Sequence, residues 1–283
     1  MKVRFWGVRG SIPVPGTDTC RYGGNSSCVE VRAEGRPPLV LDAGTGARPL
    51  GEALARSGER DIKVLFSHFH MDHVFGFPFF VPIYLPNRKI EVVVPSHSVI
   101  DAQDKLGRYM GGIYHPVRIR DLQDTLEFRP TRPDDVVDLG GYRVQTIGLS
   151  HPGGSCGYRI DADGRSFAYL TDTAPLARPG EGLLAGKALP GLERRVLKAI
   201  EGADVVAMDT MFSRAEYLDK MTWGHGYPEY AVALCEAAHV GRLILFHHAP
   251  GADDQTLDAL AEHWRGYDGV EVTLAMEGAE VSL

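Results

Sequence analysis

One short stretch of the sequence concentrates side chains that bind metal ions. Between Ser67 and His73 the chain reads Ser-His-Phe-His-Met-Asp-His, which supplies three imidazoles and one carboxylate, at His68, His70, Asp72 and His73. On extended backbone, side chains two positions apart point to the same side, so His68 and His70 can face one ion. Neutral imidazoles suit zinc, iron or manganese, and a carboxylate with a further imidazole suits a second ion. The stretch therefore predicts a metal centre rather than surface histidines in a polar loop.

Further ligand-type side chains follow other predicted strands, each close to the point where the strand ends. They are Asp42, His151, Asp172 and the pair His247 and His248. A lone histidine after a strand is more often structural than a ligand, so His151 carries little weight by itself. Side chains gathered at strand ends on one edge of a sheet are, however, a common way to build a site. The set as a whole predicts one site assembled from distant parts of the chain.

The elements that must position these side chains are predicted from apolar patterns and turn residues. Strands are predicted at 2–7, 28–32, 39–41, 62–66, 90–94, 126–128, 142–147, 155–160, 166–170, 203–208, 242–246 and 270–275. Helices are predicted at 47–57, 99–110, 191–201, 228–238 and 257–265. Three strands precede the first helix, which excludes the regular strand–helix alternation of a doubly wound fold. We expect a loop of fixed shape at 7–15 and a long connector, rich in Gly and Pro, at 175–189.

The composition is that of an ordinary globular protein, with 44% hydrophobic and 24% charged residues among 283. The formal net charge of -7 argues against a broad nucleic-acid-binding surface, which is usually basic. The four cysteines show no paired spacing, which predicts reduced thiols at Cys20, Cys28, Cys156 and Cys235. The sequence shows no signal peptide, and no run approaches about 18 apolar residues. We therefore expect a cytoplasmic protein that does not cross a membrane.

A dense aromatic segment, 74–84, follows the metal-ligand stretch. It can form a wall of a cleft beside the metal centre. It can equally be plain core, because buried aromatic side chains dominate the packing of most cores. The sequence leaves both interpretations open.

In their order along the chain, these ligand types resemble the motifs of the metallo-β-lactamase-fold hydrolases. The resemblance spans about residues 1–250. It implies a single domain over 1–283 of the α/β (α+β) class, a four-layered αβ/βα sandwich with two mixed β-sheets flanked by helices. Within the superfamily the chain looks most like the phosphodiesterase branch, which includes RNase Z and cyclic-nucleotide phosphodiesterases. The opening Phe5-Trp6-Gly7-Val8-Arg9-Gly10-Ser11-Ile12-Pro13 resembles a small uncharacterised group there.

The resemblance assigns the ligands to two divalent ions, for which zinc is the first choice and manganese or iron the alternatives. One ion would take His68, His70 and His151. The other would take Asp72, His73 and His247, and Asp172 would bridge the pair. Asp42 would orient the ligand stretch by hydrogen bonds. His248 remains an alternative to His247 as the ligand, and otherwise would contact substrate or donate a proton.

The segment Trp223-Gly224-His225-Gly226 is similar to the RNase Z element whose histidine protonates the leaving group. Asp209 would be the acidic partner of His225. The match departs from the family, which has a Ser-Thr pair where this chain has Gly226-Tyr227, and Glu where it has Asp209. The alternatives are that His225 is a surface histidine and that Asp209 is a plain strand-end cap. The resemblance thus implies four catalytic residues: Asp72, His225, Asp209 and His248.

The function implied is that of a dinuclear-metal-dependent hydrolase that cleaves a small phosphodiester, such as a cyclic nucleotide, with a metal-bridging hydroxide. The alternatives are an RNase Z-like nuclease, a hydrolase of thioesters, lactones or β-lactams, and a non-catalytic metal-binding protein. RNase Z grips tRNA with an arm rich in Gly, Pro and basic residues, whereas 175–189 holds few basic residues. We therefore expect no extended nucleic-acid binding and no membrane partner. Many relatives form dimers, so a homodimer is also expected.

Overall fold

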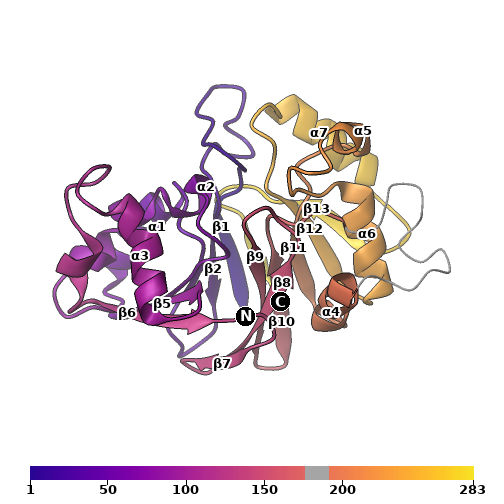
Figure 1. The fold of residues 1–283 in the computed structure, drawn as a ribbon. Helices are drawn as coiled ribbons and strands as arrows, with labels where there is room; N and C mark the ends of the chain where they lie inside the picture. Colours follow the sequence, from indigo (N-terminus) through magenta and orange to yellow (C-terminus); the bar gives the residue numbers. More distant parts are fainter. Residues whose placement is uncertain (176–190) are drawn as a thin grey trace. The chain divides into compact units, whose positions relative to one another are not determined.

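The computed structural model describes residues 1–175 and 191–283. They form two compact units, each with its own β-sheet (Figure 1). The first unit comprises Met1–Arg132, Leu139–Gly141 and Met276–Ser282, and the second comprises Pro133–Asp138, Tyr142–Ala275 and Leu283. The connector predicted at 175–189 lies, apart from its first residue, outside the described residues. Within the described ranges, no helix has the length and apolar character needed to span a membrane.

The sheet of the first unit has seven strands, in the order β14-β1-β2-β3-β4-β5-β6. The strands are β1 Lys2–Gly7, β2 Cys28–Arg32, β3 Leu39–Leu41, β4 Asp61–Leu65, β5 Lys89–Pro95, β6 Leu126–Thr131 and β14 Glu280–Ser282. Neighbours from β14 to β3 run antiparallel, and neighbours from β3 to β6 run parallel. Because parallel strands end at the same edge of a sheet, the segments after β3 and β4 begin side by side.

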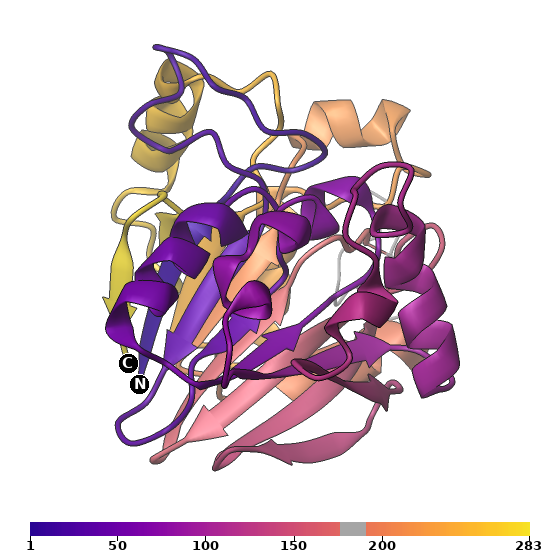
Figure 2. The same ribbon diagram turned by 90° about the vertical axis from the view of Figure 1, so that its left-hand side faces the viewer.

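The helices of this unit cover one face of its sheet, as Figure 2 shows for α1 and α3. The elements are α1 Ala47–Ser57, α2 Met71–Val74 and α3 Val99–Tyr109, with 3-10 turns η1 Phe77–Phe79, η2 Val81–Tyr84 and η3 Ile119–Leu122. Helix α1 buries Ala47, Leu50 and Leu54, whose spacing puts them on one side of a helix. It ends at Gly58, which takes the left-handed conformation that closes many helices. A continuous apolar core joins α1 and α3 to the strands beneath.

The sheet of the second unit also has seven strands, in the order β13-β12-β11-β10-β9-β8-β7. The strands are β7 Val136–Leu139, β8 Tyr142–Leu149, β9 Ser155–Ala162, β10 Arg165–Leu170, β11 Val205–Asp209, β12 Arg242–Phe246 and β13 Glu271–Leu274. Strands β10 to β13 run parallel, whereas β9 is antiparallel to both β8 and β10. Strands β8, β10, β11 and β12 therefore all end at one edge of this sheet.

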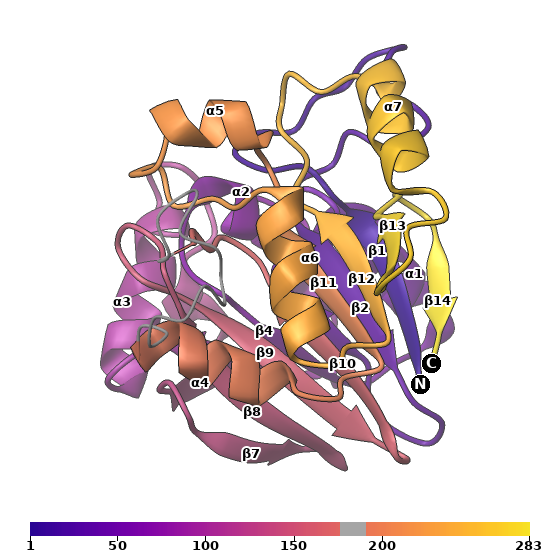
Figure 3. The same ribbon diagram turned by 90° about the vertical axis from the view of Figure 1, so that its right-hand side faces the viewer.

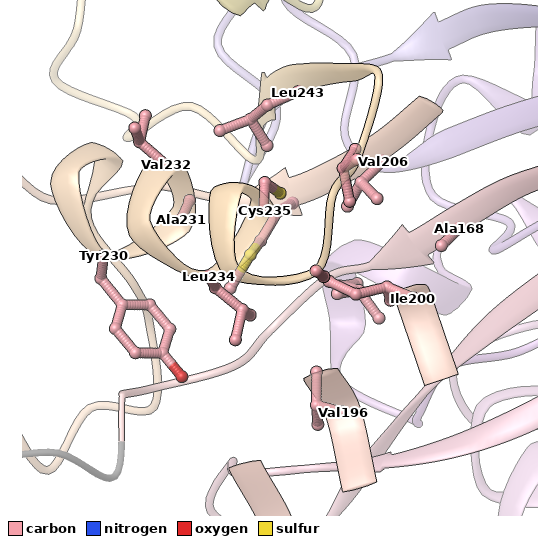
Figure 4. Close-up of a cluster of buried hydrophobic side chains, with 14 of the residues drawn as sticks. Ala168, Val196, Ile200, Val206, Tyr230, Ala231, Val232, Leu234, Cys235 and Leu243 are labelled. Carbon is pink, nitrogen blue, oxygen red and sulfur yellow. The ribbon is translucent and has the colours of Figure 1, made fainter. Parts of the chain in front are cut away.

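Helices α4 Gly191–Ile200 and α6 Pro228–Ala237 lie across this second sheet (Figure 3). The same unit also contains the helices α5 Arg214–Asp219 and α7 Asp254–Trp264. Helix α6 begins with Pro228 in its first turn, where a missing N–H is harmless. Figure 4 shows how Leu234 and Cys235 of α6 and Ile200 of α4 meet Val206 of β11 in one apolar cluster. This packing holds the helices on the strands that carry the site.

The prediction of two mixed sheets flanked by helices is confirmed. Every predicted strand and helix is present, with ends that shift by a few residues. Among the described residues, the two strands β7 and β14, the two helices α2 and α5, and the 3-10 turns were not predicted. Strands β7 and β14 are short edge strands, and pairing with a distant neighbour, which a local pattern does not reveal, decides whether they form. The single domain predicted over 1–283 stays a prediction.

The aromatic segment 74–84 divides between the two interpretations. Phe77, Phe80 and Ile83 are buried in the core of the first unit, as the core interpretation predicts. Phe75 and Phe79 instead leave 41% and 58% of their surface exposed. Tyr84 is likewise 41% exposed, so these three rings remain available for contacts with another molecule.

Candidate metal centre

In the first unit, the metal-ligand stretch lies just after β4, where the chain turns into α2. The ring centroids of His68 and His70 are 4.5 Å apart, and those of His68 and His73 are 4.3 Å apart. The Oδ2 atom of Asp72 lies 3.2 Å from Nε2 of His73. His68, Asp72 and His73 are buried, whereas His70 is exposed. The structure thus gathers the four predicted ligands of this stretch.

Asp42, which follows the neighbouring strand β3, holds this stretch in place. Its Oδ1 accepts a hydrogen bond from the N–H of Ser67 (2.7 Å), and its Oδ2 accepts one from the Ser67 hydroxyl (2.8 Å). The same Oδ2 accepts the Nδ1–H of His73 at 2.7 Å, and the Ser67 hydroxyl accepts the Nδ1–H of His68 at 3.0 Å. Because Nδ1 carries the proton in both rings, Nε2 carries the lone pair that a metal needs.

Two loops also lie against Asp72. The backbone N–H of Ser11, in the loop predicted at 7–15, donates to Oδ2 of Asp72 at 2.7 Å. A Cβ at Gly44 would collide with the carbonyl oxygen of Asp72. Glycine at this position therefore lets the loop after β3 pass directly against α2.

Helix α3 reaches the same stretch through Tyr109. The Tyr109 hydroxyl donates a hydrogen bond to the carbonyl oxygen of Phe69, the residue between His68 and His70. Burial, and then the charge of Asp72, raises the pKa of Tyr109 above its ordinary value. The phenol therefore remains protonated and able to donate over a wide pH range.

In the second unit, the ends of neighbouring parallel strands supply a second group. Asp172 follows β10, Asp209 ends β11, and His247 follows β12. His225 joins them from the loop before α6. The ligand atoms of these four residues all lie within 4.8 Å of one another, and all four residues are buried. The topology brings them together because parallel strands place their carboxyl ends at one edge.

Asp209 and His225 form a hydrogen-bonded pair, with Nδ1–H of His225 donating to Oδ2 of Asp209 at 2.8 Å. The backbone N–H groups of Met211 and Thr173 also donate to this carboxylate, at 3.0 and 3.2 Å. The carboxylate is completely buried. Backbone donors therefore hold the Asp209 carboxylate rigidly, and this carboxylate in turn orients the imidazole of His225.

Asp172 and His247 follow β10 and β12, which flank β11, and Nε2 of His247 lies 3.1 Å from Oδ1 of Asp172. The Thr171 hydroxyl donates to the same Oδ1 at 2.8 Å. Asp172 and His247 have φ angles of 48° and 63°, in the left-handed region that non-glycine residues rarely adopt. Such strain persists where the surroundings enforce it, and it clusters at functional sites.

His151, after β8, is oriented by the loop that carries His225. Its Nδ1–H donates to the carbonyl of Gly224 at 2.8 Å, and its Nε2 lies 3.6 Å from Oδ2 of Asp172. Gly224 has a φ of 89°, and a Cβ there would collide with the His151 ring. The glycine is thus required both by its own conformation and by the histidine packed against it.

The two adjacent histidines after β12 differ in their surroundings. His247 belongs to the buried group around Asp172. The Nε2–H of His248 instead donates to the carbonyl of Ala275 at 2.8 Å. The geometry therefore favours His247 as the ligand of the pair, and the roles predicted for both residues stay predictions.

The donor chemistry of both groups fits divalent metal ions. In the second unit, the carboxylates of Asp172 and Asp209 are no more than 1% exposed and lie beside imidazoles. Buried carboxylates need a cation or donors to offset the loss of hydration. In the first unit, His68 and His73 present Nε2 lone pairs, and Nε2 of His73 lies 3.2 Å from the Asp72 carboxylate. Mixed imidazole and carboxylate sets of this kind bind zinc, manganese and iron.

Six described residues with positioning roles were not predicted from the sequence. They are Ser11, Gly44, Ser67, Tyr109, Thr171 and Gly224. Ser67 and Gly224 stand inside motifs that the sequence singles out, so a search for hydrogen-bond partners of the ligands would have found them. Tyr109 carries no local signal, because its contact with Phe69 joins residues 40 positions apart.

A model of the Beta-lactamase superfamily domain matches residues 39–248 of this chain. An uncharacterized protein of Mycobacterium leprae (strain TN) is 29% identical over 178 residues, which cover 61% of this chain and 58% of that protein. The chain thus spans less than two thirds of the length of that relative. The Ribonuclease Z of Bradyrhizobium sp. (strain ORS 278) is 25% identical over 288 residues, covering 84% of this chain and 92% of that protein.

Solved structures share the fold. A diphosphatase from the PhnP family superposes with a TM-score of 0.70 at 16% identity, covering 100% of this chain and 97% of that chain. The short form of human tRNase Z gives 0.67 at 20% identity, with coverage of 100% and 99%. Unliganded yeast PDE1 gives 0.67 at 15% identity, with the same coverage. The predicted fold class is confirmed by these likenesses.

Proposed function

We propose a function for this chain from the premise that it belongs to the Beta-lactamase superfamily domain family. The proposal is that it is a metal-dependent phosphodiesterase that acts on a small phosphodiester such as a cyclic nucleotide. Membership supports a hydrolase of the metallo-β-lactamase fold, and the relatives named Ribonuclease Z support its place in the branch that includes RNase Z and phosphodiesterases. The fold implies divalent metal ions. The substrate class, the choice of zinc, and action in the cytoplasm as a homodimer belong to the proposal.

The buried pair of Asp209 and His225 carries this proposal. In the RNase Z element that the segment around His225 resembles, the histidine protonates the alkoxide that a phosphodiester releases. Hydrolysis of thioesters, lactones or β-lactams by the same ligand types is not expected to depend on such a histidine. The Nδ1–H of His225 is bound to Asp209 at 2.8 Å. A buried carboxylate at this distance stabilises the imidazolium, which is the form that can protonate a leaving oxygen.

The ligand assignment follows the motifs of the family. We assign His68, His70 and His151 to one ion. We assign Asp72, His73 and His247 to the other, with Asp172 shared by both. When bound, a pair of divalent ions polarises phosphoryl oxygens and activates water at neutral pH. The hydrogen bonds of Asp42 and Gly224 described above support this assignment, because they orient the ligand rings through Nδ1.

The charge of the chain favours a small substrate. A net charge of -7 opposes the approach of a long polyanion. A second candidate, an RNase Z-like nuclease, is favoured by the relatives named Ribonuclease Z, which align along most of their length. The two candidates share the cleavage chemistry and differ in the size of the substrate.

The test is the variant His225→Ala with His263→Ala as the matched control, because His263 is an exposed histidine on α7 of the same unit. We expect His225→Ala to lower kcat for a cyclic nucleotide and for bis-p-nitrophenyl phosphate by roughly 10²–10⁴-fold. Metal content, measured by elemental analysis, is expected to stay at the wild-type level. The control is expected to match wild type in both measurements.

Loss of metal together with activity in His225→Ala would make His225 a ligand and refute its role as an acid. Cleavage of a thioester or a β-lactam, with no hydrolysis of any phosphodiester, would refute the phosphodiesterase. Faster cleavage of precursor tRNA than of cyclic nucleotides would select the RNase Z-like candidate. The substrate panel therefore decides between the two candidates, and the variant tests the catalytic role.

A further inference from the structure

A pocket of about 640 Å³ lies in the first unit, beside α3 and η3. Its polar lining consists of Gln103, Asp104, Arg108, Arg118, Arg120 and Gln123. No predicted metal ligand lines this pocket. Its volume falls within the range of pockets that enclose small organic ligands.

The pocket is positively charged in a chain whose formal net charge is -7. Its lining holds three guanidinium groups and one carboxylate, that of Asp104. Asp121 lies just outside the lining, with Oδ1 3.9 Å from Nε of Arg120, which makes this ion pair a loose one. A local excess of guanidinium groups on an acidic protein is an attractive site for a small anion.

Two of these arginines, Arg108 and Arg118, do not pair with acidic side chains of the described residues. Asp104 nevertheless lies one helical turn from Arg108. Asp101 and Lys105 of α3 are four residues apart and pair at 2.9 Å. Asp104 and Arg108 have the same spacing on the same helix. Yet, among the residues that the structure describes, neither Arg108 nor Arg118 forms an ion pair within 4.0 Å. Their guanidinium groups are therefore available to an anion in the pocket.

Apolar side chains form the remaining lining. Met110, Ile119 and Phe128 line the pocket and are each no more than 9% exposed. Gly107 adds open space, since a Cβ there would meet nothing within 4 Å. Such a surface suits the flat apolar part of a ligand, and the amides of Gln103 and Gln123 can bind its polar edge.

We propose that this pocket binds a small phosphorylated ligand with a planar ring, of the nucleoside monophosphate class, at a site separate from the metal centre. Arg108 and Arg118 bind the phosphate, because a guanidinium matches phosphate oxygens with two parallel N–H donors. The planar ring packs against the apolar side chains of Met110, Ile119 and Phe128. The site is independent of the proposed hydrolysis, since it involves none of the metal ligands.

The test is calorimetric titration of the full chain with adenosine monophosphate, adenosine and a 12-nucleotide single-stranded RNA. The variant combines Arg108→Gln with Arg118→Gln. The control combines Arg48→Gln with Arg143→Gln, which removes the same charge from two exposed, ion-paired arginines outside the pocket. We expect the nucleotide to bind wild type and control equally, and the variant about 10–100-fold more weakly.

We also expect adenosine to bind far more weakly than the nucleotide, and added salt to weaken nucleotide binding. Hydrolysis and thermal stability are expected to be unchanged in the variant. Equal affinity of variant and control would overturn the proposal, because binding at the metal centre would survive these substitutions. Much tighter, Arg108-dependent binding of the RNA would overturn the small ligand in favour of an RNA surface. Absence of nucleotide binding to wild type would also overturn it.

Discussion

At the scale of single residues, the site rests on two buried pairs of a carboxylate and an imidazole. Asp42 binds His73 at 2.7 Å, and Asp209 binds His225 at 2.8 Å. Each pair lies within one unit. In both, the carboxylate accepts from Nδ1–H, which determines the tautomer and the direction of Nε2. On the proposed assignment, Asp42 therefore orients a metal ligand, whereas Asp209 orients a proton donor.

The substitution Asp42→Asn tests the first role. The amide has nearly the same size but loses one acceptor, so it cannot satisfy both Ser67 and His73. We expect the affinity for the metal to fall about 10–100-fold, measured by competition with a chromophoric chelator. The control is Asp124→Asn at an exposed position. Unchanged affinity in a folded Asp42→Asn protein would show that Asp42 does not orient the ligand.

At the scale of elements, the segments after the strands provide the candidate ligands, and loops orient their side chains. The loop before α6 both supplies His225 and, through Gly224, accepts the hydrogen bond from His151. The loop after β3 supplies Asp42, which accepts the hydrogen bond from His73, and Gly44, which lies against the carbonyl oxygen of Asp72. In both loops a glycine stands where another backbone or ring approaches too closely for any side chain.

The substitution Gly224→Ala, compared with Gly164→Ala, separates two effects of an added Cβ: its collision with the His151 ring and the strain of a positive φ. Gly164, in the turn between β9 and β10, also has a positive φ, but a Cβ there meets nothing within 4 Å. Gly164→Ala is expected to destabilise by about 1–2 kcal/mol from the left-handed conformation alone. Gly224→Ala must also displace His151, so we expect a larger loss in urea unfolding and weaker metal binding. An equal loss of stability in the two variants would show that a Cβ at position 224 does not collide with His151.

At the scale of the whole molecule, apolar packing suppresses the ionisation of groups in the cores. Burial, together with the charge of Glu193, raises the pKa of Tyr230 well above its ordinary value. Burial raises the pKa of Cys235 to about 12. Both residues lie on α6, in the cluster drawn in Figure 4. The fold therefore favours their neutral forms.

These shifts predict a loss of stability in alkali. A raised pKa means that the folded state holds the proton longer, so the stabilisation is complete below the unfolded pKa values of about 8.5 and 10 and decreases above them. The double variant Tyr230→Phe with Cys235→Ala removes both groups. We expect its midpoint of urea unfolding to decline less between pH 8 and about 11 than that of wild type. The control replaces the exposed Tyr114 and Cys20 in the same way and is expected to follow wild type.

The sequence by itself determined most of the elements and the ligand types of the candidate site. Alternating and helical apolar patterns are local, so they predicted every described strand except β7 and β14, and also α1 and α6, within a few residues. The stretch from His68 to His73 predicted metal binding because its ligand types are adjacent in the chain. The resemblance supplied the family, which the match over 39–248 supports.

Only the tertiary structure decided which side chains meet. The hydrogen bond from His151 to Gly224 joins residues 73 positions apart, and that from Tyr109 to Phe69 joins residues 40 apart. Strand β14 forms because Val281 pairs with Val3 at the other end of the sequence. The physical reason is the same in each case. A hydrogen bond depends on distances of tenths of an ångström between groups that sheet register and packing bring together, and local sequence contains no record of that register.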